Sequence, residues 1–360
     1  MRLLMLAAAS SVHTIRWANA FVQRGMEVHL VSLHTPHTLL DHRVTVHRFP
    51  YLKGLGYVVN GPLLARLVRT LKPDVVNAHY ATGYGTLARW CAPAPLVLNV
   101  WGSDVFGFPE KSPLHRRSLL GNLTRATHIV STSEAMAARV RSLLPVPKQL
   151  TVVPFGVDTD LFSPRPPGDT VPKGVTFGTV KALERVYGID LLIEAFALLV
   201  AQRPALELRL RIVGGGGQLE ALQRQAASSG VADKVTFVGA VPHDRVPDEL
   251  RKFDVFVALS RAESFGVAVI EAGACGLPVV VSNVGGLPEV VRNGTTGLVV
   301  PASDAFEASV QMGRLCDSPE LRTSLGRNGR EMVCSEYAWS VCVDRMLDVL
   351  QNNVRQNMNR

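Results

Sequence analysis

The sequence predicts an α/β protein with two Rossmann-like domains, each built from helices that cover a parallel sheet. The length of 360 residues exceeds one ordinary hydrophobic core, so two domains are expected. Apolar runs alternate with helical patterns from the start: residues 2–8 indicate a buried strand, 14–24 a helix and 27–33 a second strand. The alternation restarts near residue 174, after a proline-rich linker at 163–169.

The composition excludes several classes of protein. No apolar run approaches the roughly 20 residues of a membrane span. The five cysteines are scattered and form no C-x-x-C pair, which argues against a disulfide framework or a zinc site and fits a reducing cytosol. Residues 1–10 resemble a short signal peptide, but they lead directly into a helical pattern, so a first buried strand explains them better.

The basic character of the chain is concentrated in its first part. Residues 1–160 contain 17 Lys and Arg against 8 Asp and Glu, a net of +9, whereas the remainder has 21 against 22, a net of −1. A basic surface of this kind suits an anionic membrane, an anionic acceptor or solvent alone. We expect no nucleic acid as partner, because the chain has no recognised nucleic-acid module and no basic–aromatic interleaving.

The most informative stretch of the chain is residues 254–282. An apolar run at 254–259 predicts a buried parallel strand, and a turn follows it at 264–266. Small and apolar residues then predict a short helix over 266–274, which a glycine and a proline end before a second apolar strand. The turn therefore lies at the carboxyl end of a strand, where open α/β sheets bind their ligands.

The residues of this turn suit a nucleotide sugar. Gly266 permits close backbone approach, and the free N–H groups at the start of the helix favour an anion such as a phosphate. Glu263 and Glu271 lie before and inside the helix, eight positions apart. Carboxylates bind sugar and ribose hydroxyls through charge-assisted hydrogen bonds.

These residues resemble a known signature. The pair Glu263-x7-Glu271 with Phe265-Gly266 is flanked by Ser-Arg-Ala-Glu-Ser-Phe-Gly and by Ala-Cys-Gly-Leu-Pro-Val-Val, and it is similar to the motif of retaining nucleotide-sugar glycosyltransferases of the family 4 class. The resemblance implies the GT-B fold, with two Rossmann-like domains facing across a cleft. It implies an acceptor-binding domain at 1–163, a donor-binding domain at 164–335, and a final helix at 336–360 that packs back on the first domain.

The resemblance also implies roles for particular residues. Glu271 would hold the ribose hydroxyls, and Glu263 would hold a hydroxyl of the donor sugar. The N–H groups of Phe265, Gly266 and Val267 would face the phosphates.

Two further groups of donor contacts follow from the resemblance. Relatives grip the donor diphosphate with an Arg and a Lys after the first strand of the second domain, and Lys181 and Arg185 are the cations available here, at a longer spacing. Ala240 and Val241 would contact the nucleotide base. Neither a metal nor a cofactor is expected, since no D-x-D motif is present and the two cations supply the positive charge.

The first domain departs from the family pattern at two loops. Ser10-Ser11 replaces the usual Gly-Gly, and Ser11 remains a site residue because a small side chain still allows a ligand to approach. His13 contacts a ligand or serves as a helix-start hydrogen-bonder. Trp101 stands where many relatives have a histidine, and Asp104 is the nearest polar replacement. Asp104 contacts the sugar or the acceptor, or it is a helix N-cap.

Two basic segments of the first domain are expected to face an acceptor or a lipid. One is an amphipathic helix at 61–71 with Arg66 and Arg69, for which an ordinary sheet-covering role is the alternative. The other surrounds a predicted helix at 112–122 and contains the residues Lys111, His115, Arg116, Arg117 and Arg125.

The sequence therefore predicts a cytoplasmic enzyme, peripheral on the inner face of the membrane, that moves a hexose or similar sugar from a UDP- or GDP-linked donor to an acceptor hydroxyl with retention. Polysaccharide or lipid-linked glycan assembly is the process that the resemblance implies. A nucleotide-sugar epimerase and a catalytically silent sugar-binding protein are the two alternatives.

Overall fold

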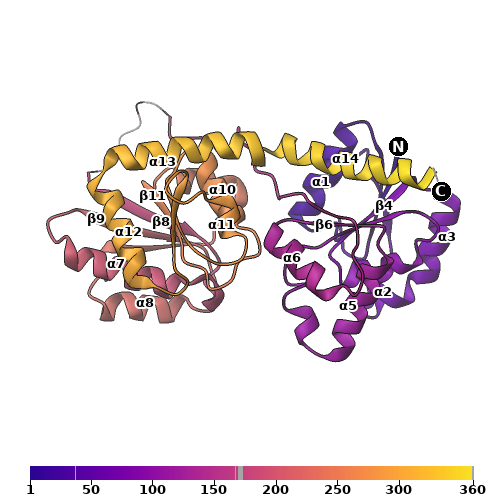
Figure 1. Ribbon diagram of the computed structural model, residues 1–360, viewed down its shortest axis with the longest axis horizontal. Coiled ribbons are helices and arrows are strands. Elements are labelled where there is room, and N and C mark those ends of the chain that lie inside the picture. Colours follow the sequence, from indigo (N-terminus) through magenta and orange to yellow (C-terminus); the bar gives the residue numbers. More distant parts are fainter. Residues whose placement is uncertain (37, 167, 169–172, 359–360) are drawn as a thin grey trace. The chain divides into compact units, whose positions relative to one another are not determined.

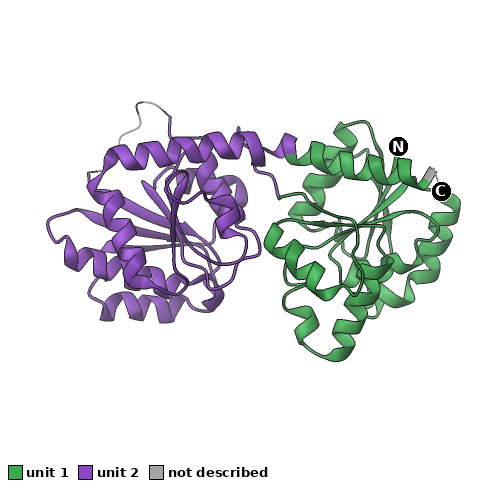
Figure 2. Cartoon of the chain, viewed as in Figure 1, with its two compact units in different colours: residues 1–154, 342–360 green, residues 155–341 purple. Residues whose placement is uncertain are grey.

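The computed structural model describes residues 1–36, 38–166, 168 and 173–358, and it divides into two compact units. Unit 1 contains residues 1–154 and the described residues from 342 onward, and unit 2 contains residues 155–341 (Figure 2). The sequence instead predicts domain limits after residues 163 and 335. Part of the predicted linker at 163–169 lies outside the described residues.

Unit 1 contains a parallel sheet with helices around it (Figure 1). Its seven strands have the order β3-β2-β1-β4-β5-β6-β7. The strands are β1 (Arg2–Leu6), β2 (Glu27–Ser32), β3 (Thr45–Arg48), β4 (Val75–His79), β5 (Leu96–Asn99), β6 (His128–Ser131) and β7 (Leu150–Val152). The helices are α1 (Val12–Gln23), α2 (Gly56–Val59), α3 (Gly61–Leu71), α4 (Gly83–Leu87), α5 (Pro113–Arg125) and α6 (Glu134–Leu143), with short 3-10 turns η1 (Ala88–Trp90) and η2 (Phe108–Glu110).

Unit 2 repeats this architecture with six parallel strands in the order β10-β9-β8-β11-β12-β13. The strands are β8 (Val175–Val180), β9 (Leu208–Val213), β10 (Val235–Gly239), β11 (Val255–Ala258), β12 (Val279–Ser282) and β13 (Gly297–Val300). The helices are α7 (Ile189–Gln202), α8 (Leu219–Ser228), α9 (Val246–Leu250), α10 (Val267–Ala274), α11 (Leu287–Val290), α12 (Ala305–Asp317) and α13 (Pro319–Met332). Short turns are η3 (Arg185–Tyr187), η4 (Ala232–Lys234), η5 (His243–Arg245) and the π-helical η6 (Val333–Tyr337).

The predicted fold class of two parallel-sheet Rossmann-like domains is confirmed. The central strands are buried throughout; β4, β5, β11 and β12 have no exposed residue. Such strands form near-continuous apolar runs because helices cover both faces of a parallel sheet. Gly54 and Gly56 predict a loop over residues 50–60, and the structure differs because the short helix α2 lies inside this segment.

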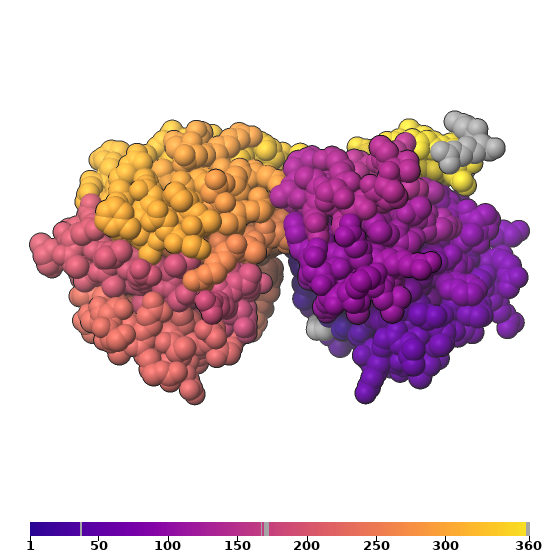
Figure 3. Space-filling model, turned by 60° about the horizontal axis from the view of Figure 1, so that its bottom comes forward, coloured from indigo at the N-terminus to yellow at the C-terminus, as the bar shows by residue number. Residues whose placement is uncertain are grey.

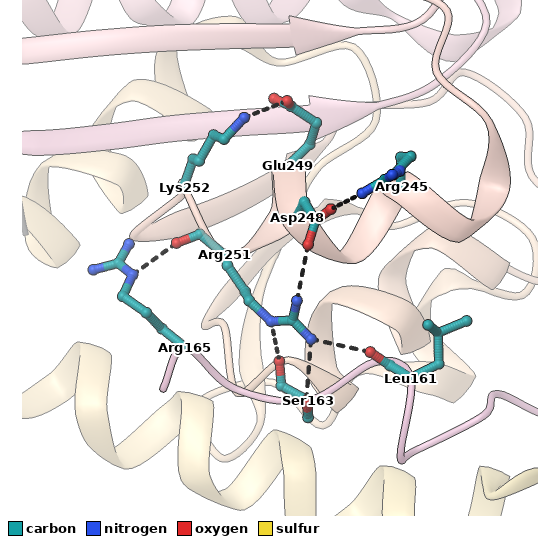
Figure 4. A network of polar contacts seen from close by, with 8 residues as sticks. All are labelled: Leu161, Ser163, Arg165, Arg245, Asp248, Glu249, Arg251 and Lys252. Carbon is teal, nitrogen blue, oxygen red and sulfur yellow. Dashed lines mark hydrogen bonds and ion pairs between the residues drawn. The ribbon is translucent and has the colours of Figure 1, made fainter. Parts of the chain in front are cut away.

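Residues 155–165 belong to unit 2 because their backbone is held there. The N–H of Val157 donates to the carbonyl of Tyr337 at 2.9 Å, and the N–H of Trp339 donates to the carbonyl of Val157 at 2.8 Å. Arg251 donates to the carbonyls of Leu161 and Ser163, both at 3.1 Å (Figure 4). These contacts explain why the division between units follows Pro154.

The last helix, α14 (Trp339–Met358), starts in unit 2 and continues in unit 1. In unit 1 it contacts β4 where Asn77 Nδ2 lies 3.9 Å from Met346 Sδ, and Thr127 Oγ1 donates to Asn353 Oδ1 at 3.2 Å. Asp344 forms an exposed ion pair with Arg24 of unit 1.

The strand order reverses once in each unit, between β1 and β4 and between β8 and β11. Ligands of open α/β sheets bind at the carboxyl ends of the strands beside such a reversal. Buried side-chain atoms without a hydrogen-bond partner within the described residues lie at both places: Thr14 Oγ1 and His79 Nδ1 in unit 1, Thr179 Oγ1 and Ser260 Oγ in unit 2. Buried polar groups normally have partners, so these atoms make both edges candidates for a ligand site, although Thr132 Oγ1 and Arg211 Nε also lack a partner among the described residues.

Candidate functional site

The loop between β11 and α10 forms the centre of the site in unit 2. Strand β11 ends at Ala258, Glu263 follows in the turn, and α10 begins at Val267 with Gly266 as its N-cap. The strand, turn and helix predicted for this stretch are therefore present. The backbone N–H groups of Phe265, Gly266 and Val267 make no hydrogen bond within the described residues, as expected for the first turn of a helix.

Glu263 is paired with a cation from the neighbouring strand. Lys181 directly follows β8, and its Nζ donates to Glu263 Oε2; the two side chains are only 11% and 12% exposed. The same Nζ lies 4.8 Å from the centroid of the Tyr187 ring, which adds a cation–π contact. The strand order that places β8 beside β11 thus brings two predicted site residues into direct contact.

Two glycine turns lie against the backbone that carries this ion pair. A Cβ at Gly285, which has φ +51°, would lie 1.8 Å from the carbonyl oxygen of Glu263. A Cβ at Gly214 would lie equally close, 1.8 Å, to the carbonyl oxygen of Lys181. Only glycine permits this approach, so the loops after β9 and β12 position the backbone of the Lys181–Glu263 pair.

Arg185 lies on η3 with an exposed side chain, and its loop is held by an anchor that the sequence analysis missed. Arg261 forms a two-pronged ion pair with Asp190, with both N–O distances at 2.7 Å. It also donates to the carbonyl of Arg185 at 2.8 Å. The planar guanidinium of Arg261 thus holds both Asp190 and the carbonyl of Arg185, which fixes the loop. A lysine ammonium could not make the same two-pronged contact with Asp190.

Glu271 lies inside α10 and is 5% exposed. Its Oε1 lies 2.8 Å from Nε2 of His243, the first residue of η5. His243 is not among the predicted site residues, although it is the one histidine that lies outside the basic first part of the chain.

The side chain of Phe265 has a packing role. It is 3% exposed, and its ring lies 6.3 Å from that of Phe155 and 6.0 Å from that of Tyr337. Ala240 and Val241, which are predicted to contact the nucleotide base, follow β10. A Cβ at Gly215 would lie 3.6 Å from the Cβ of Ala240, so this loop lies beside the four glycines that follow β9. The contacts of these residues with a donor stay predictions.

The corresponding edge of unit 1 contains Ser11 and an aromatic cluster around Trp101. Ser11 is the N-cap residue of α1, and its backbone N–H donates to the carbonyl of Ala8 at 2.9 Å. The Trp101 ring centroid lies 5.6 Å from that of His13 and 4.8 Å from that of His79. Burial lowers the pKa of His79 to about 3, so this imidazole is neutral at physiological pH.

Asp104 holds two loops of unit 1 together. It is 1% exposed and accepts from the N–H groups of Ala81 at 2.9 Å, Trp101 at 3.1 Å and Gly102 at 2.9 Å. Burial raises the pKa of its carboxyl group. These donors precede Asp104 in the chain, so it is not the N-cap of a following helix. In this structure it organises the loops after β4 and β5, and its contact with a sugar stays a prediction.

The structural role of Asp104 is testable. Asp104→Asn should lower the free energy of unfolding by about 1–3 kcal/mol, because an amide NH2 would replace an oxygen that accepts backbone N–H groups. Denaturant unfolding measures this change. The control is Asp344→Asn, which alters an exposed ion pair of the same unit and should cost less than about 1 kcal/mol. Equal effects of the two variants would contradict this role.

Comparison with known proteins decides the family. A family described as "Glycosyl transferases group 1" matches residues 166–332, and one described as "Glycosyl transferase 4-like" matches residues 2–133. The GDP-mannose-dependent alpha-(1-6)-phosphatidylinositol monomannoside mannosyltransferase of Mycolicibacterium smegmatis is 32% identical over 74% of this chain and 72% of its own. The chain belongs to the group 1 glycosyltransferases. The resemblance stated from Glu263 and Glu271 is thereby confirmed.

Other relatives of this glycosyltransferase agree. The D-inositol 3-phosphate glycosyltransferase of Acidothermus cellulolyticus is 35% identical over 78% of this chain and 67% of its own. Two solved structures, each 20% identical, share the GT-B fold. Sucrose-phosphate synthase from Thermosynechococcus elongatus has a TM-score of 0.81 over 98% of both chains. Anabaena HepE in complex with UDP has a TM-score of 0.82 over 98% of this chain and 100% of its own.

Proposed function

We propose that this glycosyltransferase moves a sugar from a nucleotide-sugar donor to a hydroxyl of a glycan or lipid-linked acceptor, with retention of the anomeric configuration. Unit 2 binds the donor and unit 1 binds the acceptor. The observation that carries the proposal is the Lys181–Glu263 pair beside the unbonded N–H groups at the start of α10. The hydroxyl oxygens of Thr179 and Ser260, which have no hydrogen-bond partner among the described residues, lie at the same sheet edge and support it.

The proposed chemistry follows from charge. The leaving nucleoside diphosphate gains negative charge in the transition state, and fixed cations and N–H groups stabilise it most where water is excluded. Glu263 and Tyr187 hold Lys181 in place by an ion pair and a cation–π contact. In our proposal the exposed Arg185 reaches the diphosphate from the loop that Arg261 anchors. When Lys181 turns to the phosphate, Glu263 is released to accept from a sugar hydroxyl.

Retention requires a defined base or nucleophile. In our proposal the leaving phosphate takes the proton of the acceptor hydroxyl, and Glu263 orients the sugar instead of attacking it. We also propose that Lys181 and Arg185 supply the positive charge that a metal gives in other transferases. Transfer should therefore persist in excess EDTA, and the anomeric signal of the product in an NMR spectrum tests retention.

A donor panel separates this function from its alternatives. One similar protein is named for GDP-mannose, and another, Anabaena HepE, was crystallised with UDP, so UDP- and GDP-linked hexoses are the first donors to test. Their names also point to inositol-containing acceptors. Transfer releases nucleoside diphosphate in an acceptor-dependent manner. An epimerase would change the donor sugar without an acceptor, and a silent binding protein would leave every donor intact.

We further propose that the protein is cytoplasmic and binds the inner face of the membrane through unit 1. Among the described residues, no helix has the length and apolar character needed to cross a bilayer. Unit 1 instead exposes apolar side chains between β3 and α2 and on α2, α3, η1 and α5. They are Tyr51, Leu52, Leu55, Val58, Val59, Leu63, Trp90 and Leu114, from 46% to 75% exposed.

Three cations line a groove beside Leu114, one of these apolar side chains. Trp90 of η1 packs over Gly61 at the start of α3, so these two elements are in contact. The groove on α5 is lined by Leu114 together with Arg89, Arg117 and Arg125. In Figure 3, the indigo to magenta atoms belong to unit 1. Exposed apolar side chains within a basic surface suit the interface of an anionic leaflet.

Charge reversal tests the membrane contact. The double variant Arg116→Glu with Arg117→Glu should weaken binding to vesicles that contain anionic lipid by roughly tenfold or more, since each basic residue near the surface contributes about 1 kcal/mol. Vesicle co-sedimentation measures this. The matched control is Arg224→Glu with Arg327→Glu in unit 2, where both side chains are exposed. Equal binding by the two double variants would contradict the assignment.

A further inference from the structure

The contact between Glu271 and His243 joins three separate elements of unit 2. His243 begins η5, Glu271 lies in α10, and the ring of Phe162 lies 5.4 Å from the imidazole ring, tilted by 53°. Phe162 is 1% exposed, so it gives the imidazole a buried support. His243 itself remains 47% exposed, whereas the side chain of Glu271 is 7% exposed.

This contact orients a carboxylate that otherwise has few constraints. Oε1 of Glu271 is the atom 2.8 Å from His243 Nε2, and within the described part of the chain no hydrogen bond involves Oε2. Other charged groups near α10 are directed elsewhere: the guanidinium of Arg330 donates to the carbonyls of Ala274 and Phe162, and that of Arg251 donates to Leu161 and Ser163. Among the described residues, Oε1 of Glu271 is thus held by His243, whereas Oε2 remains available to a ligand.

Such an arrangement suits a vicinal diol. The two hydroxyls of a ribose donate to a carboxylate only when its plane is correctly oriented, and a buried carboxylate needs a donor to keep it there. For Nε2 to donate, the imidazole must carry its proton on that nitrogen. The ring support from Phe162 and the bond to Glu271 then restrict both side chains.

We propose that His243 is a positioning residue that holds the Glu271 carboxylate in the orientation that takes the ribose diol of the donor nucleotide. This inference rests on the proposed function, in which Glu271 binds ribose. It makes His243 a determinant of the preference for ribonucleotides over nucleotides without these hydroxyls. His243 touches the nucleotide only through Glu271.

The test compares two ligands by calorimetry: the nucleoside diphosphate that wild-type protein binds, UDP or GDP, and its 2′,3′-dideoxy analogue. His243→Phe keeps a ring against Phe162 but removes the donor, so it should weaken binding of the ribonucleotide by roughly tenfold and that of the analogue by less than about twofold. His243→Gln retains an N–H donor and should recover part of this loss. Asp244→Asn, an exposed neighbour on η5, should change neither affinity.

Glu271→Ala, measured beside these variants, separates the two proposals. If Glu271→Ala weakens only the ribonucleotide while His243→Phe changes nothing, the role of His243 is overturned and the ribose site stands. If Glu271→Ala leaves both affinities unchanged, the proposed ribose site itself fails. An equal loss for both ligands in His243→Phe also overturns the inference, because it indicates a general disturbance of the loop.

Discussion

Lys181→Met should reduce the rate of sugar transfer by roughly 10²–10³-fold, because it removes a fixed cation from the leaving diphosphate. Methionine keeps most of the length of the lysine side chain but lacks the Nζ that lies 4.8 Å from the centroid of the Tyr187 ring. The loss should appear mainly in kcat, since stabilisation of a developing charge acts in the transition state. Initial rates of nucleoside diphosphate release with saturating donor and acceptor measure it.

A second Lys–Glu pair in the same unit provides the control. Lys252 forms an ion pair with Glu249, and its side chain is 52% exposed (Figure 4). Lys252→Met should leave the transfer rate within about twofold of wild type, since exposed pairs contribute about 1 kcal/mol or less. A wild-type rate in Lys181→Met would exclude this residue from the site. Lys181→Met leaves the Glu263 carboxylate without its cation, which lowers the unfolding temperature. The double variant Lys181→Met with Glu263→Gln removes this unpaired charge and therefore controls for the loss of stability.

Gly285→Ala should impair transfer by roughly 10²-fold although the residue carries no functional group. The added Cβ would lie 1.8 Å from the carbonyl oxygen of Glu263, so the loop that carries Glu263 must move. A displacement of about 1 Å in a catalytic group commonly has an effect of this size. Stability should also fall by about 1–3 kcal/mol through overpacking. Transfer rates and denaturant unfolding test both effects.

Gly294→Ala separates the clash from backbone strain. Gly294 also has a positive φ, +74°, but a Cβ there would meet no atom within 4 Å. This variant should lose only the roughly 1–2 kcal/mol of a left-handed backbone conformation and retain normal transfer. If Gly285→Ala behaved like Gly294→Ala in both measurements, the packing of Gly285 against Glu263 would have no part in positioning the site.

Much of the fold could be predicted because its signals are local. Buried parallel strands appear as apolar runs, and glycine, proline and small residues separate them from helices, so the β11–α10–β12 segment was assigned correctly. The spacing of Glu263 and Glu271 around a helix start also requires only the sequence. By contrast, α2 was missed because its four residues form too short a pattern.

The partners of the site residues could not be predicted in this way. Lys181 and Glu263 are 82 positions apart, and they meet because β8 and β11 are neighbours in the sheet. Glu271 and His243 are 28 positions apart, and they meet through η5 and α10, although the preceding strands β11 and β10 are not neighbours in the sheet. Asp104, selected as a polar residue near a sugar, is 1% exposed and bound to three backbone N–H groups.

The sequence by itself determined the class of fold, the family and the segment that carries the two glutamates, since each depends on residue type and on spacing along the chain. Only the tertiary structure decided which side chains are paired, buried or open to a ligand. The physical reason is that ion pairs, burial and the close approach of glycine turns arise between segments distant in sequence, and the order of strands in each sheet brings those segments together.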